Sequence, residues 1–238
     1  MRLLQTLFDG AKGSLVIGPS AGTMGIILGG ILLPGLGYKF SSLILSYSYN
    51  YLPLAIFLVF LGAYVLGMGM TVSGVYVVLS VLAAPALIEL GVPILAAHLA
   101  IIWFAQTSPL TPPFCLAAFV GAGIAKCNPM QAGWSSVRLG YPYYIMPFAF
   151  IYSALLLDGA LLDIIRAIVG AIIGMALLTV AFERFWIGPI SWYNSIILIF
   201  VSGVILFSTP LFQLLGLIFV VLFFLAHRRA CRLESATA

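Results

Sequence analysis

Long apolar segments alternate with short polar ones along this chain, and two of the apolar segments are interrupted in their interior. The interrupted segments are 52–90 and 93–125. Apolar segments of about 20 residues have the length that crosses a bilayer as a helix, whereas barrel strands would show short alternating runs. The pattern therefore predicts an all-α, polytopic membrane protein: a helical bundle with a re-entrant hairpin and a discontinuous helix.

The interruption in segment 93–125 is the sequence Gln106-Thr107-Ser108-Pro109-Leu110-Thr111-Pro112-Pro113. The prolines break the helix, because each removes an N–H and clashes with the preceding turn; they are Pro109, Pro112 and Pro113. A broken backbone at membrane depth persists only where protein buries it or where it lines a wet cavity. The hydroxyls of Thr107, Ser108 and Thr111, beside freed carbonyls, would suit a small hard cation. A plain proline kink is the alternative, and local chemistry leaves both open.

The interruption in segment 52–90 is rich in glycine and covers 67–74. A single helix over the whole segment would be longer than a bilayer needs. Glycine tolerates backbone conformations that other residues resist, which favours two arms joined at a tip. We therefore expect a re-entrant hairpin over 52–90.

The whole chain divides into three stretches. Residues 1–50 are expected to hold an N-terminal loop, a first span beginning at Ser14 and an interfacial segment. Residues 51–138 combine the hairpin, the discontinuous helix and an amphipathic loop at 126–138. Residues 139–238 carry the C-terminal spans and a basic tail, with Thr209-Pro210 dividing the last apolar stretch. Asp163 and Arg166 lie three residues apart and are expected to pair near the start of a span.

Composition and charge narrow the function classes. The 238 residues are 63% hydrophobic and 7% charged, with mean hydropathy +1.22. About 25% of the residues of a soluble domain are charged, so this composition excludes a soluble domain. The net charge of +4 comes mostly from loops and the tail and gives no nucleic-acid signal. Those basic residues indicate the cytoplasmic side; they are Arg2, Lys12, Lys126, Arg138, Arg184 and the tail 228–232.

Candidate chemistry is sparse. The three cysteines lie far apart, lack metal-ligand spacing and are expected to be free thiols. His98 could relay protons inside the membrane, although a histidine there is more often hydrogen-bonded to a neighbouring helix. The first residues show no short apolar run followed by a small-residue cleavage site, so no secretory signal peptide is expected. No cofactor is expected beyond a transported ion.

Several short motifs occur in one order along the centre of the chain. They are Gly67-Met68-Gly69, Ala83-Ala84-Pro85-Ala86-Leu87, Leu90-Gly91-Val92-Pro93, Ala96-Ala97-His98-Leu99, Leu110-Thr111-Pro112-Pro113, Ala122-Gly123-Ile124-Ala125 and Asn128-Pro129-Met130. Together they resemble the C-terminal half of the large membrane subunit of TRAP (tripartite ATP-independent periplasmic) transporters, in the branch with fused membrane subunits. The resemblance covers nearly the whole chain.

The resemblance implies half of an inverted-repeat, elevator-type secondary transporter in the bacterial or archaeal cytoplasmic (inner) membrane. Such transporters import organic acids, delivered by a periplasmic substrate-binding protein, with an ion gradient, and sodium is the expected ion. The missing partners would be the N-terminal half and the small-subunit region, so the chain looks like a split or truncated permease, or one cut for study. The implied cation ligands are Gly67, Gly69, Thr71 and Ser73 at the tip and Thr107, Ser108 and Thr111 at the break.

One departure from the family pattern affects the tip. The family commonly continues with a proline and two threonines, whereas here Thr71 stands at the proline position and Val72 lacks a hydroxyl.

Two other functions compete with transport. A membrane-embedded enzyme would need mid-span catalytic groups, and no motif such as His-Glu-x-x-His is present. A scaffold or non-transporting remnant would also fit a half-repeat that lacks its counterpart.

Overall fold

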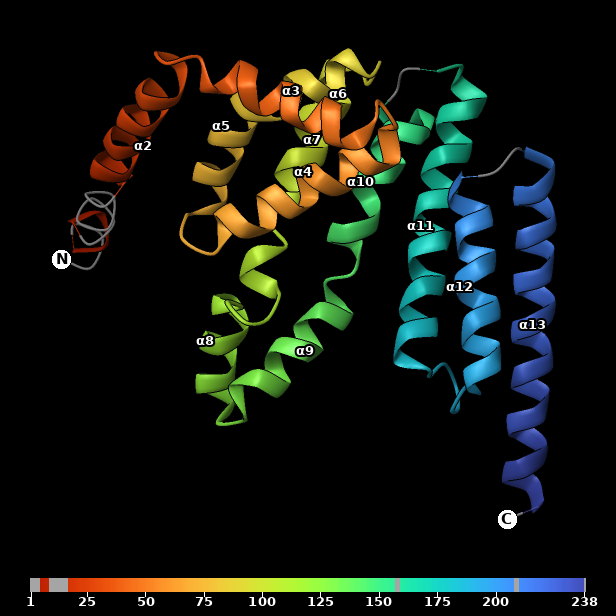
Figure 1. The fold of residues 1–238 in the computed structure, drawn as a ribbon. Helices are drawn as coiled ribbons and strands as arrows, with labels where there is room; N and C mark the ends of the chain where they lie inside the picture. Colours follow the sequence, from red (N-terminus) through yellow and green to blue (C-terminus); the bar gives the residue numbers. More distant parts are fainter. Residues whose placement is uncertain (1–4, 9–16, 157–158, 208–209, 238) are drawn as a thin grey trace. The chain divides into compact units, whose positions relative to one another are not determined.

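The computed structural model describes residues 5–8, 17–156, 159–207 and 210–237, and it is helical almost throughout (Figure 1). The expected loop at 9–13, the expected first residue of the first span, Ser14, and Thr209 lie outside the described residues. The elements are α2 (Ile17–Leu32), α3 (Leu36–Ser48), α4 (Leu52–Gly67), α5 (Val72–Leu82), α6 (Ala84–Glu89), α7 (Ile94–Ala105), η1 (Ser108–Leu110), α8 (Leu116–Ala125), α9 (Pro129–Leu139), α10 (Pro142–Tyr152), η2 (Ala154–Leu156), α11 (Leu161–Glu183), α12 (Trp192–Phe207) and α13 (Pro210–Thr237). The expected all-α class is confirmed.

The chain divides into two compact units, residues 1–106 and 107–238. The division falls at the proline-rich break, inside the stretch 51–138 that was expected to combine the hairpin, the discontinuous helix and the amphipathic loop. Each unit is described by itself below.

In the first unit, α2 and α3 are joined by a sharp bend. Together they have the length and hydropathy of a span, but they meet at 70°. Gly35 lies between them with φ +70, a left-handed conformation that glycine adopts without a steric penalty. The two helices form a bent pair because the Pro34-Gly35 sequence cannot continue a helix.

The glycine-rich interruption in the first unit is a tip, as expected. Helix α4 ends at Gly67 and α5 begins at Val72, so a single overlong helix is wrong. The role assigned to glycine was less accurate, because Gly69 does not occupy the left-handed region. Helix α5 starts instead because the Thr71 hydroxyl accepts a hydrogen bond from the Gly74 N–H at 3.3 Å, which is an N-cap.

The second arm of this hairpin is two helices where the sequence suggested one. Helix α5 stops at Leu82 and α6 begins at Ala84, with Pro85 near its start. A proline cannot continue the helical hydrogen-bond ladder, so the backbone kinks there. The buried Ser41 hydroxyl on α3 donates to the Leu82 carbonyl at 2.7 Å, which stabilises the kink from a neighbouring helix.

Helix α6 ends in a Schellman motif that its sequence encodes. Gly91 has φ +88, the Val92 N–H donates to the Leu87 carbonyl, and the Gly91 N–H donates to the Ile88 carbonyl. Leu87 and Val92 are both buried, which supplies the apolar contact typical of this motif.

In the second unit, segment 126–138 was expected to be an amphipathic loop, and it is helix α9 from Pro129 onward. The Asn128 side chain accepts hydrogen bonds from the N–H groups of Met130 and Gln131, at 2.9 and 3.3 Å. Proline suits the first helical position because its missing N–H has no intrahelical partner there. The Asn128-Pro129 pair therefore starts a helix.

Helices α11, α12 and α13 pack side by side in the second unit (Figure 1). Glycines allow close approach: a Cβ on Gly174 of α11 would lie 2.7 Å from Leu206 Cγ of α12. The Ser202 hydroxyl also donates to the Gly174 carbonyl at 2.8 Å. Small residues and interhelical hydrogen bonds are the usual means of packing helices in membranes.

Two helical stretches within the described residues are long and apolar enough to cross a membrane, namely α11 and residues 210–227 of α13. The bent pair of α2 and α3 makes a third if it counts as one span. Helices α4, α5, α7, α8 and α12 are apolar but shorter. A multi-pass membrane protein with interrupted helices accounts for both the long helices and the shorter apolar ones.

Candidate functional site

The proline-rich break separates α7, which ends at Ala105, from α8, which begins at Leu116. Between them lies only the single 3₁₀ turn η1, and the Pro112–Pro113 peptide bond is cis. Most of the predicted hydroxyl ligands here are deeply placed, because Thr107 and Ser108 are 0% exposed. The break is therefore a stretch without α-helix that is buried at Thr107 and Ser108, partly buried at Thr111 and exposed at Pro113.

Several carbonyl oxygens at the break already have partners. The Thr107 carbonyl accepts from the Leu110 N–H at 3.2 Å and from the Thr111 hydroxyl at 2.5 Å. The Ser108 carbonyl accepts from the Thr111 N–H at 3.2 Å. Freed carbonyls were expected here, but the Thr107 and Ser108 carbonyl oxygens each have one remaining lone pair at most, which makes them weaker candidates for a cation.

Helix α9 holds the break from one side of the second unit. The Ser136 hydroxyl lies 2.5 Å from the Leu110 carbonyl and 2.8 Å from the Gly133 carbonyl. A Cβ on Gly133 would lie 2.6 Å from Cys115 Sγ and 3.1 Å from Pro112 Cγ, so only glycine fits at this contact. The glycine and the serine of α9 therefore fix the path of the loop.

The Ser108 hydroxyl is different from its neighbours. It is buried and has no hydrogen-bond partner within the part of the chain that the structure describes. A buried polar group without a partner costs about 1–3 kcal/mol, so such groups are few in native structures and call for an explanation, such as a bound ion or water. Among the predicted ligands at the break, the Ser108 hydroxyl oxygen is the one with the most lone pairs left to bind an ion.

The predicted ligands at the hairpin tip belong to the first unit and lie in a more open setting. Thr71, Ser73 and Gly69 are exposed, and the hydroxyl oxygens of Thr71 and Ser73 lie 3.3 Å apart. Gly67 is the last residue of α4, whereas Thr71 is the N-cap of α5. The tip thus combines the carbonyl end of one helix with the amide end of the next.

His98 on α7 has a specific neighbour. Its Nδ1 atom lies 3.3 Å from the Tyr76 hydroxyl on α5. The two rings are arranged edge to face, with their centroids 6.0 Å apart. This contact links two helices of the first unit and accounts for a polar side chain at this position. Whether the pair also moves protons stays a prediction.

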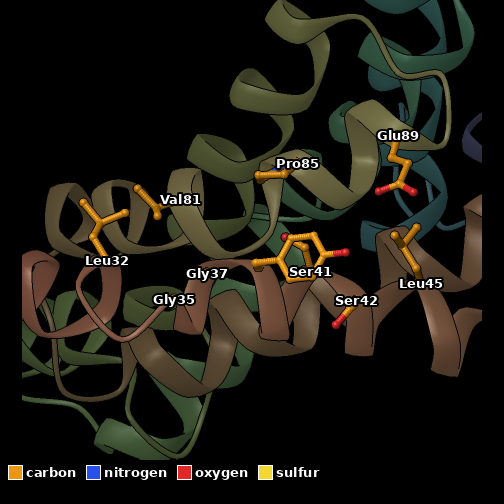
Figure 2. A pocket seen from close by; sticks show the side chains of 10 residues that line it. Leu32, Gly35, Gly37, Ser41, Ser42, Leu45, Val81, Pro85 and Glu89 are labelled. Atoms are coloured by element: carbon orange, nitrogen blue, oxygen red, sulfur yellow. The ribbon is translucent and has the colours of Figure 1, made fainter.

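A cavity of about 470 Å³ opens on the first unit between α3 and the α5–α6 kink (Figure 2). Its wall includes Ser41, Ser42, Pro85 and Glu89, and Figure 2 shows the Glu89 carboxylate at one end of the group. It contains none of the residues predicted to bind a cation. The kink at Pro85, which the sequence pattern did not reveal, shapes this cavity.

The family model for the tripartite ATP-independent periplasmic transporter, DctM component, matches residues 1–161. That is more than half of the chain. The chain belongs to the DctM family. Comparison with curated proteins and with solved structures found no match.

The resemblance to the large TRAP subunit is thus confirmed, and the DctM family is a family of transporters. The match ends at residue 161, so most of α11 and all of α12 and α13 lie beyond it. The tip and the break both fall inside the matched region. A TRAP-type permease component is therefore the functional class of this DctM chain.

Sequence reasoning missed two residues that shape the break of this DctM chain. Tyr144 on α10 hydrogen-bonds the Thr111 hydroxyl at 2.5 Å, and Ser136 on α9 reaches the Leu110 carbonyl. Tyr144 had no signal beyond its place in an aromatic run. For Ser136, helical spacing from Gly133 and Gly140 could have suggested a close helix–loop contact.

Proposed function

We propose that this chain is the C-terminal part of a TRAP-type secondary active transporter that imports organic acids with a sodium gradient. The observation that carries the proposal is the buried Ser108 hydroxyl, which has no hydrogen-bond partner among the described residues and lies in an interrupted helix of a DctM-family chain. Interrupted membrane helices are the usual ion and substrate sites of secondary transporters.

The proposed cation site lies at the break. Hydroxyl and carbonyl oxygens are hard ligands, and Thr107, Ser108 and Thr111 place three hydroxyls within five residues of backbone. Ser108 is 0% exposed, so an ion bound to its hydroxyl must lose most of its hydration shell. Mg²⁺ dehydrates reluctantly, which supports a monovalent ion such as Na⁺. Ser108 is the primary ligand in this proposal, and Thr111 is secondary because its hydroxyl already has two partners.

The hairpin tip has two helix ends of opposite polarity. The C-terminal end of α4 at Gly67 carries partial negative charge and suits a cation, together with Gly69. The N-terminal end of α5, at Thr71 and Ser73, carries partial positive charge and suits an anion. This polarity supports a division of the tip, with a carboxylate substrate at the α5 end and cation contacts confined to the α4 end.

The proposal includes partners. A periplasmic substrate-binding protein would deliver the organic acid, and the N-terminal half and small-subunit region of a permease would complete the two-sided site. The membrane would be the bacterial or archaeal inner membrane.

Reconstitution tests this function. The chain is co-expressed with the N-terminal half of a fused TRAP permease, purified, and placed in liposomes with a binding protein loaded with radiolabelled organic acid. An inward sodium gradient should drive uptake by the assembly, and neither the chain alone nor a potassium gradient should. Absence of uptake for every acid in a broad panel, with the complex intact, would favour a non-transporting scaffold.

A further inference from the structure

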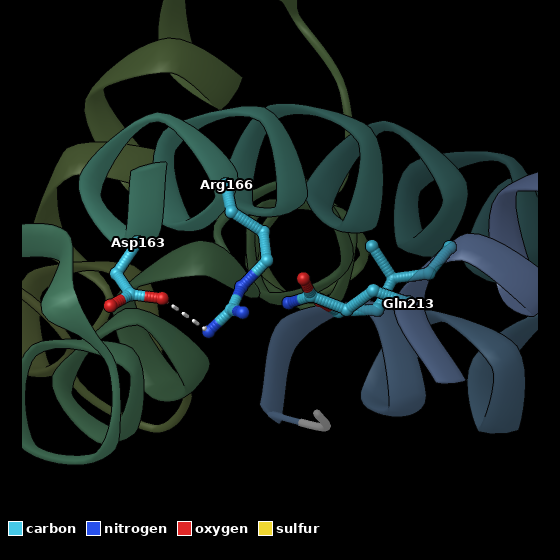
Figure 3. Close-up of polar contacts among 4 residues, drawn as sticks. Asp163, Arg166 and Gln213 are labelled. Carbon is cyan, nitrogen blue, oxygen red and sulfur yellow. Dashed lines mark hydrogen bonds and ion pairs between the residues drawn. The ribbon is translucent and has the colours of Figure 1, made fainter. Parts of the chain in front are cut away.

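A polar pocket of about 240 Å³ lies in the second unit where α11 and α13 begin. Its lining includes Asp163, Arg166 and Gln213, which Figure 3 shows facing a common space. These three residues follow residue 161, so they lie beyond the region matched by the DctM family, although Tyr152, Ser153, Ala154 and Gly159 of the same lining lie inside it. It is also separate from every residue assigned above to transport.

The position of this pocket relates it to the membrane surface. Helix α11 and residues 210–227 are the two stretches long enough to span a bilayer, and the pocket lies at the N-terminal end of both. Arg184 and the basic tail follow their opposite ends, and basic residues flank spans on the cytoplasmic side. The pocket therefore belongs to the extracytoplasmic end of the two spans, at headgroup level.

Gln213 supplies an unused acceptor. Its side chain is 7% exposed, and its Nε2 donates to the Ile205 carbonyl at 2.8 Å, which fixes the orientation of the amide. The Oε1 atom on the other side is buried and has no partner in the described part of the chain. Leaving a buried acceptor unpaired is costly, so this geometry calls for a hydrogen-bond donor that occupies the pocket.

Asp163 and Arg166 add one charge of each sign. Arg166 Nη2 lies 3.2 Å from Asp163 Oδ1, and both side chains are more than a third exposed, so each can take a further partner. The guanidinium has five N–H donors and the carboxylate has two oxygens. The pocket thus offers two acceptors, Gln213 Oε1 and Asp163, beside one strong anion-binding donor.

We propose that this pocket binds the phosphoethanolamine headgroup of an aminophospholipid. The primary ammonium donates to Gln213 Oε1 and to the Asp163 carboxylate, and the phosphate accepts from Arg166. A lipid is the source because the site lies at headgroup level. Exposed leucines adjoin it, where acyl chains can lie, namely Leu161, Leu162 and Leu211.

A headgroup methylation series tests the proposal on the unmodified chain. The full-length protein is purified, delipidated and incubated with phosphatidylethanolamine, its N-methyl and N,N-dimethyl derivatives, phosphatidylcholine or phosphatidylglycerol, and retained lipid is counted by native mass spectrometry. One phosphatidylethanolamine should be retained per chain, with retention falling by about tenfold for phosphatidylcholine, which lacks an N–H donor, and for phosphatidylglycerol, which lacks a cation. Equal retention of all five lipids would overturn the proposal.

Two variants and a soluble ligand complete the test. Arg166→Gln and Gln213→Met should each reduce phosphatidylethanolamine retention by about tenfold, whereas Arg184→Gln, at the other end of α11, should leave it unchanged. Unchanged retention in both pocket variants would place the lipid elsewhere and overturn the assignment. Soluble phosphoethanolamine should not displace the lipid; if it does at similar concentration, the ligand is a soluble amine phosphate and the lipid assignment is wrong.

Discussion

The Thr111 hydroxyl lies 2.5 Å from the Tyr144 hydroxyl, across 33 residues of sequence. Thr111 donates its single hydrogen to the Thr107 carbonyl, so Tyr144 acts as the donor to Thr111. This chain of hydrogen bonds runs from α10 to the start of the break. A residue of α10 thereby stabilises the loop that the transport proposal depends on.

A double-mutant cycle tests this link. Thr111→Val and Tyr144→Phe should each lower the free energy of unfolding by about 0.5–1.5 kcal/mol. The double variant should cost less than the sum, because both changes break the same hydrogen bond. Unfolding is followed by tryptophan fluorescence in mixed detergent micelles. Strict additivity would show that the two hydroxyls are not coupled.

Ser136 should contribute more to the free energy of unfolding than the adjacent Ser135. Ser136→Ala removes the hydroxyl that reaches the Leu110 and Gly133 carbonyls, and it should lower the free energy of unfolding by about 1 kcal/mol. Ser135→Ala, on the exposed side of the same helix, should change it by less than about 0.5 kcal/mol. The same unfolding assay compares them, and equal effects would contradict the contact between α9 and the break.

Two glycines in the C-terminal helices should respond in opposite directions to alanine. Gly174→Ala places a Cβ 2.7 Å from Leu206 Cγ and should destabilise the protein by about 1–3 kcal/mol. Gly203→Ala meets nothing within 4 Å and should be neutral or stabilising, since alanine favours the helix by about 1 kcal/mol. Thermal unfolding in detergent measures the sign of the stability change in each variant. Stabilisation by Gly174→Ala would show that α11 and α12 are not in close contact there.

The kink between α5 and α6 offers another matched pair. Ser41→Ala deletes the buried hydrogen bond to the Leu82 carbonyl and should lower the free energy of unfolding by about 1 kcal/mol. The adjacent Ser42 is exposed, and its hydroxyl donates to the Lys39 carbonyl within its own turn. Ser42→Ala should therefore have a much smaller effect, and a larger effect than that of Ser41→Ala would refute the account of the kink.

The sequence predicted those parts of the fold that depend on local chemistry. The prolines of the break and the glycine-rich interruption at the tip act on their own segments, so both interruptions were predictable from the local sequence, whereas the Thr71 N-cap was not predicted. The Asp163–Arg166 pair was also predictable, because three-residue spacing places both side chains on one helical face, and the two lie 3.2 Å apart.

The features that were missed depend on contacts distant in sequence. The kink at Pro85 was overlooked because the apolar pattern continues through it, and its supporting hydroxyl comes from Ser41 on another helix. Helix α9 was taken for a loop because its composition is polar. The use of the break's carbonyls by Thr111 and Ser136 could not be inferred from spacing, since it requires the loop path itself.

The central claim is that the break holds the coupling cation, with Ser108 as its main ligand. The most direct test is the sodium concentration for half-maximal uptake in the assembled transporter. Ser108→Ala should raise it by about tenfold or more, while Thr107→Val and Thr111→Val should raise it less. Ser42→Ala, remote in sequence and exposed, serves as the control. An unchanged sodium dependence in Ser108→Ala, with normal protein levels and uptake, would contradict the account.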